Sequence, residues 1–212
     1  MRNLLLEKIY PITHSDDPDN NNHVKLAKDF LEAGIRFIQI RQGKSRDSFF
    51  YNQLLQIKTL CETLQAQFLI NDRVDMALAT GANGVHLGQN DLPVSTARKL
   101  LGSRAIIGLS THTQQQFKAA QSEDINYVAI GPIFPTSTKK NIWDPIGLTA
   151  LKQIITYSNH PVVAIGGISL EKAYDVWEAG ADSVAVISDI VTASNPKNRV
   201  RQYLSLSHKI TS

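Results

Sequence analysis

The sequence predicts an α/β fold, a closed (β/α)8 TIM barrel that takes up residues 1–212 as a single domain. Eight short apolar or β-branched runs alternate with helix-period stretches, at spacings of about 16 to 34 residues. Nearly every run ends in polar residues, whereas an open doubly wound sheet, the alternative, usually gathers its ligand chemistry at one switch point. Three helical stretches also end in a similar glycine-containing motif just before the next apolar run: Glu32-Ala33-Gly34, Thr80-Gly81-Ala82 and Glu178-Ala179-Gly180-Ala181.

The predicted strands are short and bounded by glycine or polar residues. In chain order they are Lys8–Thr13, Arg36–Arg41, Phe68–Asn71, Gly84–Leu87, Ala105–Ser110, Tyr127–Gly131, Pro161–Ile165 and Asp182–Ile187. Helix-start residues follow several of them, namely Ser45, the run Thr111-His112-Thr113, and Ser169 with Glu171. We expect the short polar tail after Tyr203 to fray.

Composition and charge exclude several classes of protein. A hydrophobic content of 42% in 212 residues suits one domain with its own core. No apolar run approaches the roughly 20 residues that span a bilayer, and no signal peptide is recognisable, so we expect a cytoplasmic protein without a membrane partner. The net charge of +3 is spread along the chain, which is not the pattern of a nucleic-acid-binding protein. Cys61 is interpreted as a buried structural thiol, and the oligomeric state is left open, a homo-oligomer included.

Residues 68–92 predict a β-α-β unit with a carboxylate after each strand. The linking helix takes its apolar face from residues 74–78, including Leu78. Parallel strands joined by a right-handed crossover lie side by side, so Asp72 and Asp91 should emerge at the same edge. Two carboxylates there repel one another unless a cation or a proton lies between them.

In a closed barrel the strand exits face one mouth, and their polar residues form one candidate site. The last two exits commonly hold a phosphate in such barrels, so we expect a monophosphate there, with a simple glycine turn as the alternative. The cations of the second and sixth exits suit a diphosphate bridged to the carboxylates by Mg²⁺, with exposed ion pairs as the alternative. In chain order the exits carry Gln39, Arg41 and Lys44; Asn71 and Asp72; Asp91; Ser110 and His112; Thr136, Ser137, Thr138 and Lys139; Gly166-Gly167; and Ile187-Ser188.

Seven motifs, in this order, closely resemble the successive motifs of thiamine-phosphate synthases: IQIRQGK, INDRVDMAL, GVHLGQNDL, GLSTHT, AIGPIFPTSTKK, VVAIGGIS and ADSVAVIS. They extend from about residue 36 to residue 190. The resemblance implies a (β/α)8-barrel transferase of thiamine biosynthesis. Its expected reaction joins 4-amino-2-methyl-5-(hydroxymethyl)pyrimidine diphosphate to 4-methyl-5-(hydroxyethyl)thiazole phosphate by Mg²⁺-assisted dissociative substitution, giving thiamine phosphate and pyrophosphate.

The resemblance also implies roles for single residues, carried over motif by motif. The implied magnesium ligands are Asp72 and Asp91. The implied catalytic residues are Arg41, Ser110 and Lys139. The pyrimidine diphosphate would contact Gln39, Arg41, Asn71, Ser110 and Lys139, and the thiazole phosphate would contact Thr136, Ser137, Thr138, Gly167, Ile187 and Ser188.

Two positions depart from the family pattern. Gly43 stands where the family usually has a lysine, so Lys44, one residue later, is either a displaced diphosphate ligand or an ordinary solvated lysine. Asp189 stands where the family usually has a small residue. A carboxylate beside a phosphate is unfavourable unless it points away or has a basic partner.

Two other functions stay open at this point. Related barrels are thiazole tautomerases that use a histidine, and His112 stands at that position, while a non-catalytic phosphate-binding regulator would explain the two departures. The pair Asp72 and Asp91 favours the synthase, because a tautomerase needs no clamp for a metal and a diphosphate. His86 is interpreted as a hydrogen-bonded core histidine, and His14 and His23 as surface residues.

Overall fold

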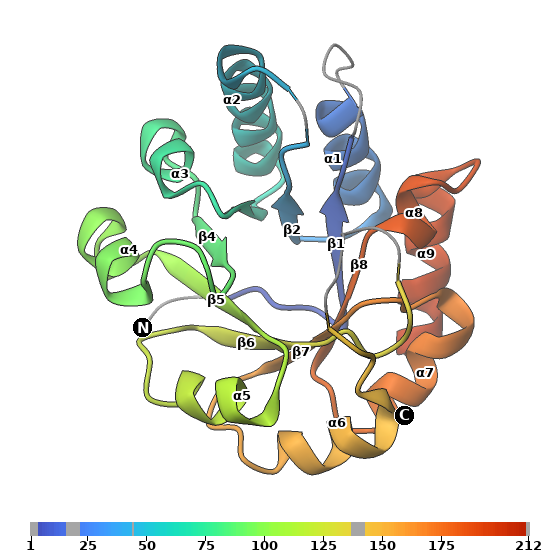
Figure 1. Ribbon diagram of the computed structural model, residues 1–212. Coiled ribbons are helices and arrows are strands. Elements are labelled where there is room, and N and C mark those ends of the chain that lie inside the picture. Colours follow the sequence, from blue (N-terminus) through green and yellow to red (C-terminus); the bar gives the residue numbers. More distant parts are fainter. Residues whose placement is uncertain (1–3, 16–21, 44, 137–142, 211–212) are drawn as a thin grey trace.

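Eight parallel strands close into a barrel in chain order in the computed structural model, which describes residues 4–15, 22–43, 45–136 and 143–210 (Figure 1). The strands are β1 (Ile9–Thr13), β2 (Phe37–Ile40), β3 (Gln67–Asn71), β4 (Gly84–Leu87), β5 (Ile106–Thr111), β6 (Tyr127–Ile130), β7 (Val162–Ile165) and β8 (Ser183–Val186). β8 pairs with β1 through Val184 and Ile9, which completes the closure. The predicted barrel is confirmed, and each predicted strand end lies within one residue of the observed end.

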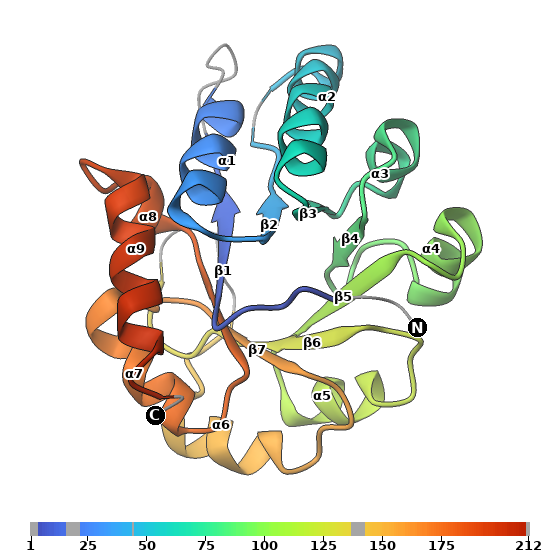
Figure 2. The ribbon, with the colours of Figure 1, turned by 180° about the vertical axis from the view of Figure 1, so that it is seen from behind.

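Helices surround the strands on the outside, as both views of the ribbon show (Figures 1 and 2). They are α1 (Asn22–Ala33), α2 (Asp47–Thr63), α3 (Val74–Thr80), α4 (Val94–Leu101), α5 (Gln114–Ala120), α6 (Gly147–Ile155), α7 (Leu170–Glu178), α8 (Ser188–Val191) and α9 (Pro196–Ser207). The prediction of a fraying tail after Tyr203 is wrong over the first part of that tail, because α9 continues to Ser207, which is buried.

The helices follow the sequence signals except at one predicted start and at one residue of a predicted buried face. Thr113 caps α5 by accepting a hydrogen bond from the backbone N–H of Gln116, and Gly81 ends α3 in the left-handed conformation with φ of 67°. The start predicted at Ser45 is one residue early, since Arg46 precedes the first turn of α2. Leu78 does not belong to the buried face of α3, because its side chain is 57% exposed.

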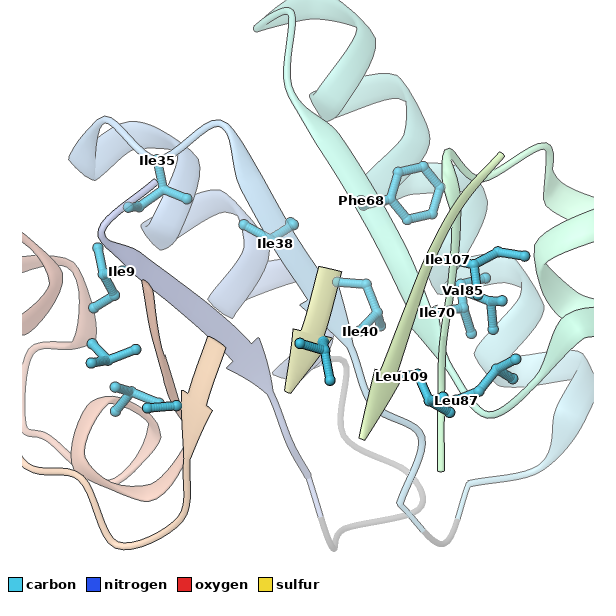
Figure 3. Packing of buried hydrophobic residues seen from close by; sticks show 14 of the residues in the cluster. Ile9, Ile35, Ile38, Ile40, Phe68, Ile70, Val85, Leu87, Ile107 and Leu109 are labelled. Atoms are coloured by element: carbon cyan, nitrogen blue, oxygen red, sulfur yellow. The ribbon is translucent and has the colours of Figure 1, made fainter. Parts of the chain in front are cut away.

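Apolar residues form two cores, one on each face of the closed sheet. The outer core lies between strands and helices and includes Ile38, Ile70 and Val85 (Figure 3). The inner core fills the barrel with alternate residues of the same strands: Tyr10, Ile12, Phe37, Leu69, Ile106, Tyr127, Ala129, Val163 and Ala185. The barrel interior is therefore packed below the mouth and is not a pore.

Two smaller expectations can be compared with the structure. Cys61 is 2% exposed within the outer core, which confirms the interpretation of a buried thiol. Within the described ranges, no helix has the length and apolar content needed to cross a membrane.

Candidate active site

A cavity opens at the carboxyl ends of the strands, where a (β/α)8 barrel carries its chemistry. Nine of the residues to which the resemblance assigns a role line it: Gln39, Arg41, Asn71, Asp72, Ser110, Thr136, Gly167, Ile187 and Ser188. Asp91 is not among the lining residues, although its neighbour Gly88 is. Lys44, Ser137, Thr138 and Lys139 lie outside the described residues.

The two carboxylates predicted at one edge are tied to neighbouring strands. Asp72 follows β3 with φ of 63°, a left-handed conformation that is uncommon for a residue other than glycine, and its N–H donates to the carbonyl of His86 on β4 at 2.8 Å. The Asp91 Oδ2 atom accepts from the N–H of Gly88, two residues after His86, at 2.6 Å. Asp72 therefore faces the cavity, whereas Asp91 lies behind Gly88 in the loop that follows β4.

Arg41 is held at the mouth by a histidine from the neighbouring strand exit. Its Nη1 donates to Nδ1 of His14 at 2.8 Å. His23 is only 1% exposed, and its Nδ1 lies 2.8 Å from Thr13 Oγ1. Burial, with a smaller contribution from the charge of His14, lowers the pKa of His23 to about 4. The interpretation of His23 as a surface residue is therefore wrong, whereas His14 is half-buried at the mouth.

The exits of β6 and β7 pack closely against one another. Ile133 and Phe134 donate their N–H groups to the carbonyls of Ile165 and Gly166, both at 3.0 Å. Gly166 and Gly167 have φ of 99° and 65°, and a Cβ added to Gly167 would lie 2.8 Å from the carbonyl oxygen of Phe134. Only glycine fits this turn without moving the β6 loop, which delivers Thr136 to the cavity.

Asp189, one of the two departures from the family pattern, is engaged outside the cavity. The hydroxyl of Tyr203 donates to its Oδ2 at 2.8 Å, and Arg199 Nε lies 3.8 Å from the same oxygen. Burial and this hydrogen bond raise the pKa of Tyr203. Asp189 thus has both a donor and a basic partner on α9, so it leaves the adjacent Ser188 available to an anion.

His112 has fixed partners at the mouth. Its Nδ1 lies 2.7 Å from the carbonyl oxygen of Gly131, which requires the ring proton on Nδ1. The ring also stacks on Trp143, with centroids 5.3 Å apart.

Arg73, which sequence reasoning did not single out, joins the loops after β2 and β3. It forms ion pairs with Asp47 at 2.9 Å and Asp75 at 2.6 Å, and Nη1 also donates to Gln42 at 2.9 Å. Hydrogen bonds from Arg73, then from Gln42, lower the pKa of Asp47 to about 2. Gln42 follows Arg41 and Arg73 follows Asp72, so this cluster fixes the loops that carry two cavity residues.

A chain of hydrogen bonds crosses the barrel beneath the cavity. It begins at Gln39, passes through Tyr10, Tyr127 and His86, and ends at Ser110. His86 is buried and hydrogen-bonded as predicted, since its two nitrogens lie 2.8 Å from Tyr127 Oη and 2.8 Å from Ser110 Oγ, but its side chain also lines the cavity. The two tyrosines were not predicted to matter; the available signal was a phenol inside each of two apolar strands, because a buried hydroxyl needs a partner.

Comparison with known proteins gives one consistent result. Residues 9–190 match the family model described as thiamine monophosphate synthase. The thiamine-phosphate synthase of Lawsonia intracellularis is 38% identical over 203 residues, covering 94% of each chain, and that of Leptospira biflexa is 45% identical over 169 residues, covering 78% of this chain and 80% of the relative. The solved structure of thiamine phosphate pyrophosphorylase from Pyrococcus furiosus superposes with a TM-score of 0.86 at 30% identity, covering 97% of each chain.

Proposed function

The chain belongs to the thiamine-phosphate synthase family, and we propose that the cavity residues named above bind the two substrates of that family's reaction. The enzyme joins the aminopyrimidine diphosphate to the thiazole phosphate and releases pyrophosphate and thiamine phosphate. The observation that carries the assignment is that nine residues predicted from separate motifs line one cavity.

The pyrimidine end of the first substrate occupies the inner part of the site in this proposal. Gln39 is 1% exposed yet lines the cavity, and with Ser110 it offers the amide and hydroxyl groups that an aminopyrimidine ring requires. Asn71 and Arg41, two half-buried lining residues, meet the diphosphate in this proposal. The guanidinium of Arg41 supplies charge-assisted hydrogen bonds to phosphate oxygens, and the His14 contact limits its freedom.

The carboxylates suit a magnesium ion. Carboxylate and phosphate oxygens are the ligands that Mg²⁺ prefers, and one oxygen of Asp91 is already used by Gly88, which orients the other. Across the described ranges, no group of three or more His, Cys, Asp or Glu residues could hold a metal by itself, so a bound ion would complete its shell from the diphosphate and water. When bound, Mg²⁺ would neutralise charge on the leaving pyrophosphate.

The thiazole phosphate binds in this proposal between the exits of β7 and β8. Gly167 and Ser188 line this part of the cavity together with Ile187, and glycine lets phosphate oxygens approach backbone N–H groups closely. The engagement of Asp189 by Tyr203 and Arg199 supports this assignment, because it removes the main electrostatic objection.

The residues then act by position and charge more than by proton transfer. Loss of pyrophosphate leaves a cationic methylene that the electron-rich aminopyrimidine stabilises, and the thiazole nitrogen attacks it. Holding both partners in line converts a bimolecular step into an effectively intramolecular one. Arg41, with Lys139 from outside the described residues, would stabilise the leaving group electrostatically.

A mass-spectrometric assay of the purified protein tests this function. With both substrates and Mg²⁺, the expected product has the mass of thiamine phosphate, and omission of either substrate abolishes it. Thiamine phosphate should also fall strongly in the Ser110→Ala variant and little in Thr111→Val, which removes the neighbouring buried hydroxyl on β5. Absence of thiamine phosphate from the complete wild-type reaction would contradict the proposal.

A further inference from the structure

The hydrogen-bonded chain beneath the cavity connects two residues that the proposed function assigns to the pyrimidine ring. Gln39 Nε2 donates to the hydroxyl of Tyr10 at 2.9 Å, and that hydroxyl lies 3.0 Å from the hydroxyl of Tyr127. Tyr127 Oη lies 2.8 Å from His86 Nδ1, and His86 Nε2 lies 2.8 Å from Ser110 Oγ. Gln39, His86 and Ser110 line the cavity, while the two tyrosines are fully or almost fully buried.

The direction of every hydrogen bond in this chain follows from its first member. Tyr10 accepts from Gln39, so its own hydroxyl proton must go to its other partner, Tyr127, because a buried donor without an acceptor is costly. Tyr127 then donates to His86 Nδ1 for the same reason. A neutral imidazole has one N–H, so it lies on Nε2 and donates to Ser110.

The two ends of the chain consequently have opposite polarity. Ser110 accepts from His86 and directs its own proton toward the cavity as a donor. Gln39 donates one of its two amide N–H groups to Tyr10, which fixes the orientation of the amide and leaves its carbonyl oxygen as an acceptor. Burial raises the pKa of Tyr10 and of Tyr127, so both phenols keep the protons that this order requires.

We propose that Tyr10, Tyr127 and His86 are positioning residues that couple Gln39 to Ser110 through the barrel and thereby select a 4-aminopyrimidine. This ring offers an amino donor beside a ring-nitrogen acceptor, which complements the acceptor of Gln39 and the donor of Ser110. The 4-oxopyrimidine analogue offers a carbonyl acceptor beside a ring N–H donor, so its polarity is reversed at both contacts. The identity of the ligand rests on the proposed function. The donor and acceptor directions along the hydrogen-bonded chain do not depend on it.

The packing around Tyr127 supports a dedicated place for this chain. Gly108 on β5 pairs in register with Tyr127 on β6, and a Cβ added to Gly108 would overlap the phenol ring. The ring of His86 stacks on that of Tyr127, with centroids 5.6 Å apart. The absence of a side chain at Gly108 therefore gives the phenol the room it needs to reach His86.

Nitrogen-15 NMR of the substrate-free protein tests the order without any ligand. We expect the Nε2–H tautomer at His86, with the resonances assigned by comparison with a His86→Gln variant. A predominant Nδ1–H tautomer would overturn the relay, whatever the enzyme's substrate.

Binding by two pyrimidine diphosphates tests the selectivity. Calorimetry without the thiazole phosphate should give a wild-type Kd for the 4-amino compound about 100-fold or more below that for the 4-oxo compound, because the wrong ring leaves both polar contacts unpaired. Tyr127→Phe, and independently Tyr10→Phe, should reduce that ratio about tenfold, the equivalent of one hydrogen bond, with the Kd for inorganic pyrophosphate unchanged.

Thr111→Val is the matched control for these variants. Thr111 is buried on β5 beside Ser110, and its hydroxyl donates to the carbonyl of Ala129, which is not part of the hydrogen-bonded chain from Gln39 to Ser110. This control should keep the wild-type ratio. Tyrosine variants that fold and keep that ratio would overturn the proposed coupling. A wild-type protein that binds neither pyrimidine diphosphate would overturn the proposed function and the proposed selectivity. The NMR result would still decide the direction of the hydrogen bonds between Gln39 and Ser110.

Discussion

Gly167→Ala should damage thiazole-phosphate binding far more than it damages the fold. Gly167 has φ of 65°, where a residue other than glycine costs about 1–2 kcal/mol. The new Cβ would also lie 2.8 Å from the carbonyl oxygen of Phe134, closer than real Cβ atoms approach. The β6 loop must therefore move, and a displacement of about 1 Å at a site can reduce the rate about 100-fold.

Gly81→Ala provides the control for Gly167→Ala. Gly81 has nearly the same φ, 67°, but a Cβ there would meet only the flexible ammonium end of Lys58, at 3.2 Å. Both variants should lose about 1–2 kcal/mol from backbone strain in urea unfolding, while steady-state kinetics should show a rise in the KM for thiazole phosphate only in Gly167→Ala. Equal kinetic effects in the two variants would refute the argument that the turn positions the β6 loop.

Three further predictions concern charges. Asp91→Asn should keep the contact with Gly88 but lower kcat on the order of 100-fold and raise the Mg²⁺ concentration needed for half-maximal rate; titration of activity with Mg²⁺ checks this, and an unchanged profile would exclude Asp91 as a ligand. Arg73→Lys, which cannot make two bidentate pairs, should raise the KM for pyrimidine diphosphate about tenfold and leave that for thiazole phosphate unchanged, so an equal rise in both would point to a general loss of structure. The pKa of His23 is depressed to about 4 in the folded protein, so the unfolded chain takes up this proton first as pH falls. The free energy of unfolding should therefore decrease by about 2 kcal/mol from this residue between pH 7 and pH 5, and His23→Gln should flatten that part of the curve in urea titrations; an equally steep curve in the variant would contradict the assignment.

The barrel could be predicted from the sequence because its signals are local and repeated. Short apolar runs such as Gly84–Leu87, each followed by a polar exit, identify buried parallel strands, and closure brings those exits together. The errors occurred where long-range contacts decide. The tail after Tyr203 continues α9 to the buried Ser207 because α9 packs against α1 and α8, and no local pattern in a polar tail reports this.

The candidate site was predicted less completely than the fold. Residues at strand ends, such as Arg41 and Asp72, could be assigned because a strand exit has one direction. The environments of His14 and His23 depend on partners elsewhere in space, so their spacing in the sequence indicated nothing. The chain through Tyr10 and Tyr127 joins residues 117 positions apart, and periodicity identifies such tyrosines as interior without stating what their hydroxyls meet.

The filled interior of the barrel also bears on how substrates and products reach the cavity. Phe37, Leu69 and Tyr127 belong to the buried inner core, which fills the barrel below the site in the part of the chain that the structure describes. Substrates and products would then enter and leave through the same opening, the mouth of the cavity at the carboxyl ends of the strands. In the proposed arrangement, a molecule bound against Gln39 would bind before a partner that lies above it, and it would leave after that partner. The inner core that stabilises the fold would therefore also determine the order in which ligands bind and leave.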